Sequence, residues 1–178
     1  GNDTNALNFL DFFSQKAQES KYLSDEEKWY LLAIYKNTYG IIQKDCGQSE
    51  LGLKSFLEEY EYLTKITGKN LNDQIANVLD NIANIYRNQN NMNEAFRYYN
   101  KALSYAENEK HQLLRIYGNI GFAYKQQALY NEALEYINKS LDYSIEIGDK
   151  RNECISLQHL GNCYICLYST NPNMEYLK

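Results

Sequence analysis

The chain has 178 residues, 44% of them hydrophobic, and its 18 basic and 23 acidic side chains give a net charge of −5. This length fits one domain with a continuous apolar core. The charges of both signs are scattered along the chain, which argues against a nucleic-acid partner, because such proteins carry a basic stripe. No apolar run approaches 18 residues, so the sequence predicts no contact with a membrane.

Two helical segments precede the most regular part of the chain. Residues 5–21 carry apolar side chains at helical spacing, which predicts a first helix. Ser24 followed three residues later by Glu27 predicts a capping box at the start of the next helix. With one Pro, nine Gly and no strand-like alternation, the whole chain is expected to be all-α.

A short pattern with one small residue then recurs three times. The segments are Ile82-Ala83-Asn84-Ile85-Tyr86, Ile120-Gly121-Phe122-Ala123-Tyr124 and Leu160-Gly161-Asn162-Cys163-Tyr164. Their small residues are 38 and 40 residues apart. A fixed period of this size indicates stacked supersecondary units instead of a single globular core.

The second half of each unit also repeats. Two full copies agree in register: Ala95 with Ala133, Tyr99 with Ile137, and Ala102 with Ser140. Gly40, Gly52 and Phe56 keep the same spacings in a looser upstream copy. This pattern resembles the tetratricopeptide repeat family. The resemblance implies antiparallel helix pairs stacked as a right-handed superhelix with a concave groove, that is, an α-solenoid.

The repeats divide one expected domain, residues 1–178, into five parts. These are an N-terminal helix (1–23), a degenerate repeat (24–75), two full repeats (76–113 and 114–153) and a truncated repeat (154–178). The last repeat stops inside its expected second helix, which predicts that the chain is part of something longer.

The family resemblance also implies a binding groove, because the first helix of each unit lines the concave face. The implied groove residues are Asn77, Asp80, Asn81, Asn84, Arg87 and Asn88; Arg115, Gly118, Asn119, Phe122, Lys125 and Gln126; and Ile155, Gln158, His159, Asn162, Ile165 and Cys166. Each Asn amide has donors and an acceptor and can bind the backbone of an extended peptide. Arg87, Arg115 and Lys125 could hold a carboxylate. The alternative is that these amides simply face water.

Reaction chemistry is not expected. The sequence has no glycine-rich phosphate loop, no H-E-x-x-H motif and no nucleophile elbow. His159, Cys163 and Cys166 share a helix face, but a fourth metal ligand is not evident. The sequence therefore predicts no enzyme activity, no metal and no cofactor.

Two functions follow from these patterns. The first is a non-catalytic scaffold that binds a protein or an extended peptide in the groove, as the sensory or regulatory region of a longer signalling or transcription-regulatory protein. The unit length is similar to that of bacterial tandem-repeat regulators. The alternative is self-assembly through an apolar face of the last repeat, formed by Leu160, Tyr164, Leu167 and Tyr168. The compartment is open: thiols suit the cytoplasm, and a start at Gly1 also fits a periplasmic domain after signal removal.

Overall fold

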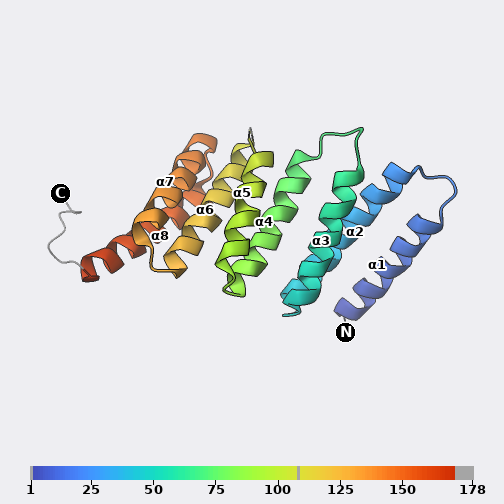
Figure 1. Ribbon diagram of the computed structural model, residues 1–178, viewed down its shortest axis with the longest axis horizontal. Helices are drawn as coiled ribbons and strands as arrows, with labels where there is room; N and C mark the ends of the chain where they lie inside the picture. The colour runs from blue at the N-terminus through green and yellow to red at the C-terminus, as the bar shows by residue number, and fades with distance from the viewer. Residues whose placement is uncertain (1, 108, 171–178) are drawn as a thin grey trace.

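The fold is a single row of helix pairs. The structure is a computed structural model that describes residues 2–107 and 109–170, and these form eight α-helices without a strand. Figure 1 shows the helices side by side along the long axis, with the two ends of the chain far apart. The helices are α1 (Asn2–Glu19), α2 (Asp25–Asp45), α3 (Ser49–Lys65), α4 (Asn72–Asn88), α5 (Met92–Tyr105), α6 (Lys110–Gln126), α7 (Tyr130–Ile147) and α8 (Lys150–Thr170). Packing of adjacent helices makes the fold an α-solenoid, as expected.

Small residues bring the two helices of each pair together. A Cβ atom added to Gly121 in α6 would lie 2.6 Å from Ile137 Cγ1 in α7, which is closer than real Cβ contacts allow. A Cβ atom on Gly40 in α2 would lie 2.9 Å from the Phe56 ring in α3. Residues 24–75 therefore use the same close approach as the full repeats, with Phe56 where Ile137 stands.

Four helices end with the same turn. In each, one residue has a left-handed backbone conformation, either the C-cap or the residue after it. The backbone N–H of the next residue then donates to the carbonyl oxygen five residues earlier. The left-handed residues are Gly47 (φ +79°), Asn90 (φ +60°), Ala128 (φ +58°) and Gly148 (φ +74°). The closing bonds are 2.8 to 3.1 Å long. A left-handed Ala is strained, because its Cβ crowds the following carbonyl.

The helix starts agree in part with the sequence pattern. The capping box is confirmed: the Glu27 N–H donates to Ser24 Oγ, and the Ser24 N–H donates to the Glu27 carboxylate at 2.8 Å. Helices α4 and α6 begin at Asn72 and Lys110, four residues before the repeat starts expected at 76 and 114. The second helix expected for the last repeat falls on residues 171–178, which lie outside the described residues.

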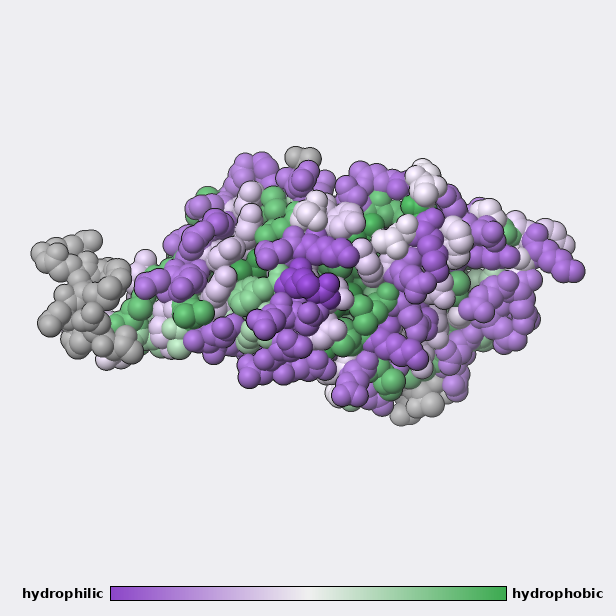
Figure 2. Space-filling model, viewed as in Figure 1, coloured by the Kyte–Doolittle hydropathy of each residue, from purple (hydrophilic) through white to green (hydrophobic). Residues whose placement is uncertain are grey.

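Apolar side chains are concentrated between the helices of the central repeats. Leu79, Ile82, Tyr99, Ile116 and Ile120 are buried in one continuous core. On the face drawn in Figure 2, hydrophilic residues predominate and apolar residues show as narrow patches between them. Within the described residues, no helix has the length and apolarity that a membrane crossing requires.

Candidate functional site: the groove

A buried carboxylate lies between α4 and α6, in the middle of the predicted groove. Asp80 of α4 is fully buried. It accepts hydrogen bonds from Arg115 Nη1 at 2.7 Å, from Asn119 Nδ2 at 2.9 and 3.1 Å, and from Asn84 Nδ2 at 3.2 Å. The Tyr99 hydroxyl of α5 donates to Asn84 Oδ1 at 2.8 Å. We call these five residues the Asp80 network; it joins α4, α5 and α6.

The Asp80 network changes how three of the predicted groove residues are interpreted. Asp80 was expected to line the groove surface, but this prediction is wrong. Its side chain points toward α6 and has no exposed area. Burial raises the pKa of Asp80, while Arg115, Asn119, Arg87 and Asn84 oppose that shift. The amide groups of Asn84 and Asn119 that donate to Asp80 are already engaged within the chain.

The next section of the groove is open. Gly118 of α6 holds the register position that Asp80 holds in α4, and a Cβ atom there would lie 3.1 Å from Ser140 Oγ of α7. A pocket of about 300 Å³ lies beside Gly118, between α6, α7 and α8, and Arg87 of α4 also lines it. Its lining is Arg87, Leu114, Arg115, Gly118, Asn119, Phe122, Ile137, Ser140, Asn152, Ile155, Ser156 and His159. We call it the Phe122 pocket.

Cationic and polar groups surround the Phe122 ring. The Arg87 guanidinium carbon lies 4.8 Å from the ring centroid and Lys125 Nζ lies 4.9 Å from it. The ring centroids of Phe122 and His159 are 5.6 Å apart. Arg87 and Lys125 form no ion pair with a carboxylate in the part of the chain that the structure describes. The pocket therefore presents positive charge against an aromatic face.

Two groups in this pocket are poised for a further partner. Arg87 Nε is buried and has no hydrogen-bond partner among the described residues. His159 Nδ1 lies 3.1 Å from Lys125 Nζ. Burial, followed by the nearby Lys125 ammonium, lowers the pKa of His159. An anion in the pocket would pair with the Arg87 guanidinium and would offset the repulsion between Lys125 and protonated His159.

The pocket unites some of the predicted groove residues and not others. Seven of the predicted residues line it: Arg87, Arg115, Gly118, Asn119, Phe122, Ile155 and His159. Lys125 is not part of the lining but contacts two residues of it, Phe122 and His159. The other predicted residues do not line it: Asn77, Asp80, Asn81, Asn84, Asn88, Gln126, Gln158, Asn162, Ile165 and Cys166. Asn152 and Ser156 were missed in the sequence. Helical spacing from Ile155 and His159 could have found them, because residues three or four apart share a face.

The expected apolar face of the last repeat needs correction. Leu160 and Leu167 are buried within the chain, with exposed fractions of 8% and 9%. Leu160 packs with Ala133, Ile137 and Cys163, so α7 already covers this side of α8. Tyr164 and Tyr168 are more exposed.

Among the described residues, no group of His, Cys, Asp and Glu is arranged to hold a metal ion.

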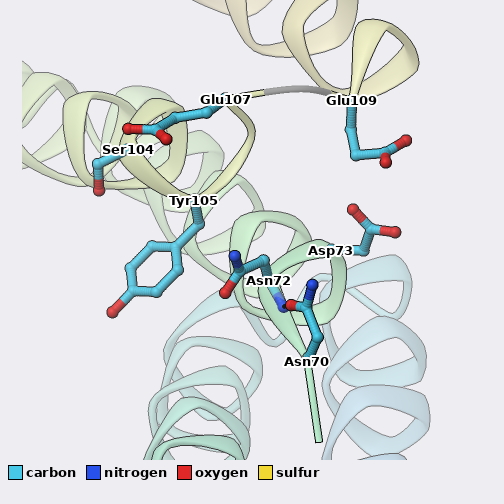
Figure 3. A pocket seen from close by; sticks show the side chains of 7 residues that line it. All are labelled: Asn70, Asn72, Asp73, Ser104, Tyr105, Glu107 and Glu109. Carbon is cyan, nitrogen blue, oxygen red and sulfur yellow. Dashed lines mark hydrogen bonds between the residues drawn. The ribbon is translucent and has the colours of Figure 1, made fainter.

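A further pocket lies outside the groove and contains none of the predicted residues. Figure 3 shows its side chains, which come from the start of α4, the end of α5 and the segment before α6. Its volume is about 270 Å³. Asp73, Glu107 and Glu109 give it an acidic character, and nothing in it points to a particular ligand.

Comparison with known proteins agrees with this fold. The crystal structure of BtubC (BKLC) from P. vanneervenii is similar to the chain, with a TM-score of 0.82 and 16% sequence identity. The similarity covers 94% of this chain and 67% of that protein. No curated protein matches the sequence. Residues 76–109 and 114–144 match the family described as "Tetratricopeptide repeat". These segments hold the Asp80 network in α4 to α6 and the α6 and α7 sides of the Phe122 pocket, and this part of the chain consists of two tetratricopeptide repeats.

Proposed function

We propose that the groove binds an extended segment of a partner protein and that an acidic group of this segment enters the Phe122 pocket. Tetratricopeptide repeats generally mediate contacts between proteins and are typically non-catalytic. The proposal adds which surface binds and which chemistry it selects. A carboxylate, either an acidic side chain or a chain terminus, is the expected ligand.

The observation that carries the proposal is the pair of cations at the Phe122 ring, Arg87 at 4.8 Å and Lys125 at 4.9 Å, neither of which has a carboxylate partner among the described residues. A ligand carboxylate beside them would form charge-assisted hydrogen bonds. Arg87 and Lys125 supply the charge, and Phe122 supplies an apolar wall for the aliphatic part of the segment. The pocket volume of about 300 Å³ suits one or two side chains of a larger ligand.

The asparagines have a smaller part in this proposal than the sequence suggested. Asn84 and Asn119 hold Asp80 and Tyr99, so their substitution would disturb the helix packing as well as any binding. Asn81 and Asn162 remain proposed contacts to the backbone of the bound segment. Arg87 Nη1 donates to the Tyr99 hydroxyl at 3.4 Å, a longer contact than the bonds of Asn84 and Asn119, so a test that removes Arg87 also needs a check of folding.

The test is selection from a random displayed-peptide library on three proteins. Wild type is compared with Arg87→Gln and with Arg97→Gln, whose guanidinium is exposed on α5 and pairs with Glu94. Circular dichroism verifies that all three are folded. We expect wild type and Arg97→Gln to enrich peptides that share an Asp, a Glu or a free C-terminus. We expect Arg87→Gln to bind these peptides at least about tenfold more weakly.

Two results would contradict the proposal. Equal binding by Arg87→Gln and wild type would remove the Phe122 pocket as the site. A folded wild type that enriches nothing would reject the peptide groove and favour the self-assembly alternative. Sedimentation analysis then decides that alternative, because a Tyr168→Ser variant should lower the oligomeric state.

We also propose a regulatory context, on the resemblance of the unit length to bacterial tandem-repeat regulators. In this view the repeats are the sensory region of a longer signalling or transcription-regulatory protein. Sequencing the surrounding gene tests this. A kinase, cyclase or DNA-binding domain in the same reading frame would support it, and a reading frame that encodes repeats alone would contradict it.

A further inference from the structure

A second pocket of the groove contains a buried carboxyl group. This pocket, of about 210 Å³, lies between α2, α3 and α4. Its lining is Tyr30, Ala33, Ile34, Asn37, Glu59, Leu63, Gln74 and Asn77. Glu59 of α3 is only 4% exposed. We call this space the Glu59 pocket.

Among the described residues, Glu59 has an amide partner but no ion-pair partner. Asn37 Nδ2 donates to its two carboxyl oxygens at 3.1 and 3.0 Å. Within residues 2–107 and 109–170, no Lys or Arg forms an ion pair with Glu59. On the side of α4, the pocket is lined by the amides of Gln74 and Asn77. Burial raises the pKa of Glu59 to about 8, and the Asn37 hydrogen bonds only partly oppose the shift.

The middle of the groove shows how this fold satisfies a buried carboxylate. There, the first helix of the following repeat supplies Arg115, which stands six residues before Gly121 and pairs with Asp80 at 2.7 Å. The equivalent residue for the Glu59 pocket is Asn77, six residues before Ala83. The buried Asp80 therefore has a guanidinium partner from the next repeat, whereas the equivalent position beside Glu59 holds an amide.

The register of α3 makes this carboxyl group specific to the first repeat. Glu59 stands three residues after Phe56, where the later repeats place Ala102 after Tyr99 and Ser140 after Ile137. Ser140 lines the Phe122 pocket as Glu59 lines its own. The Glu59 pocket and the Phe122 pocket are thus equivalent sites two repeats apart. The first is lined by a carboxyl group and the second by guanidinium groups.

We infer that the Glu59 pocket binds the side chain of a Lys or Arg from the segment that occupies the groove. This rests on the proposed function, because that segment must pass both pockets. A volume of about 210 Å³ is below the roughly 300–1,000 Å³ of small-molecule sites and fits a single long side chain. Ile34 and Leu63 would pack on its aliphatic stem, and Glu59 would receive its charge. The bound segment then carries a basic residue toward α2 and an acidic group toward α8.

Three cations lie near the pocket and each has another contact. Arg115 pairs with Asp80 and donates to Asn77 Oδ1 of the lining. Lys36 of α2 forms an ion pair with Glu58. Lys69 lies 5.0 Å from the centroid of Tyr30, and its charge lowers the pKa values of Glu26 and Glu27. Only Glu59 is therefore expected to respond to a cation in the pocket. Because the cation binds the carboxylate form, its affinity should rise as the pH increases toward 8.

The experiment uses n-butylammonium and methylguanidinium as probes of the Lys and Arg side chains, with n-butanol as the neutral control. NMR follows the Asn37 side-chain amide and the Glu59 carboxyl carbon during titration. Wild type is compared with Glu59→Gln and with Glu61→Gln, an exposed carboxylate on the same helix that pairs with Lys65. We expect both cations, but not butanol, to shift these signals in wild type and Glu61→Gln. Glu59→Gln should weaken binding at least tenfold, and the wild-type affinity should increase from pH 6 to pH 8.

The outcomes separate this inference from the proposed function. Equal titration of wild type and Glu59→Gln, or no titration of either at pH 8, would overturn the cation pocket without touching the Phe122 pocket. Peptides that wild type enriches and Arg87→Gln loses, but that lack a shared Lys or Arg, would also overturn it. In that case the proposed function would stand. A loss of Lys and Arg enrichment on Glu59→Gln alone would support the inference.

Discussion

The central repeats and the last helix place equivalent residues in different surroundings. Asp80 in α4 and Gln158 in α8 hold the same register position, yet Asp80 is fully buried and Gln158 is exposed. Gly121 in α6 is pressed against Ile137, whereas no described atom lies within 4 Å of a Cβ atom built on Gly161 in α8. The repeat pattern therefore sets a position on the helix, and the next helix of the stack decides what that position does.

The largest test of this comparison is to add a side chain at both glycines. Gly121→Leu should lower the free energy of unfolding by about 3 kcal/mol or more, because the branched side chain forces α6 and α7 apart. Gly161→Leu should change it by no more than about 0.5 kcal/mol. Urea denaturation followed by circular dichroism measures both. Equal losses would show that α8 is packed as tightly as α6.

The next test removes the polar side chain at the equivalent position in both regions. Asp80→Ala should destabilise the protein by about 2–3 kcal/mol, because Arg115 and two amides lose their shared acceptor. Arg115 is partly exposed, so water can take over some of its hydrogen bonds and limit the loss. Gln158→Ala should be nearly neutral in the same urea titration. A neutral Asp80→Ala would mean that the Asp80 network contributes nothing to packing.

A third test extends the comparison to the first repeat through pH. The pKa of Glu59 is raised to about 8 from its ordinary value of 4.5, so between these two pH values the folded chain holds a proton that the unfolded chain releases. The stability of wild type should then fall as the pH rises, by about 2 kcal/mol between pH 6 and pH 7.5. Glu59→Gln should lack this dependence, whereas Glu61→Gln should keep it. Parallel pH profiles of wild type and Glu59→Gln would refute the buried ionisation.

The smallest expected effects concern the turns between the paired helices. Ala128 (φ +58°) and Gly47 (φ +79°) hold equivalent turn positions. Ala128→Gly should stabilise the chain by about 1 kcal/mol, because glycine adopts this conformation without strain. Gly47→Ala should cost a similar amount. Melting temperatures that move in the same direction for both variants would show that the two turns differ.

Much of the architecture could be predicted from local sequence signals. The apolar and small residues that recur about every 40 positions identified the helix pairs, since their effect depends on spacing along the chain. Ser24 and Glu27 identified a helix start, because a capping box needs only four consecutive residues. Arg87 and Lys125 were predicted to share one face of the stack, because both lie on the first helix of a repeat, and the structure places both at the Phe122 ring.

The character of each groove section was decided by the tertiary structure. Asp80 meets Arg115 and Asn119 across 35 and 39 residues of sequence, and Asn37 meets Glu59 across 22. A buried carboxylate is favourable only where donors from other helices converge on it, and spacing within one repeat does not reveal whether they do. The sequence by itself thus determined the helices, the register and the side that faces the groove. Only the stacking of one repeat on the next decided that Asp80 is paired, that Gly118 lines a pocket and that Glu59 lies buried without an ion-pair partner among the described residues.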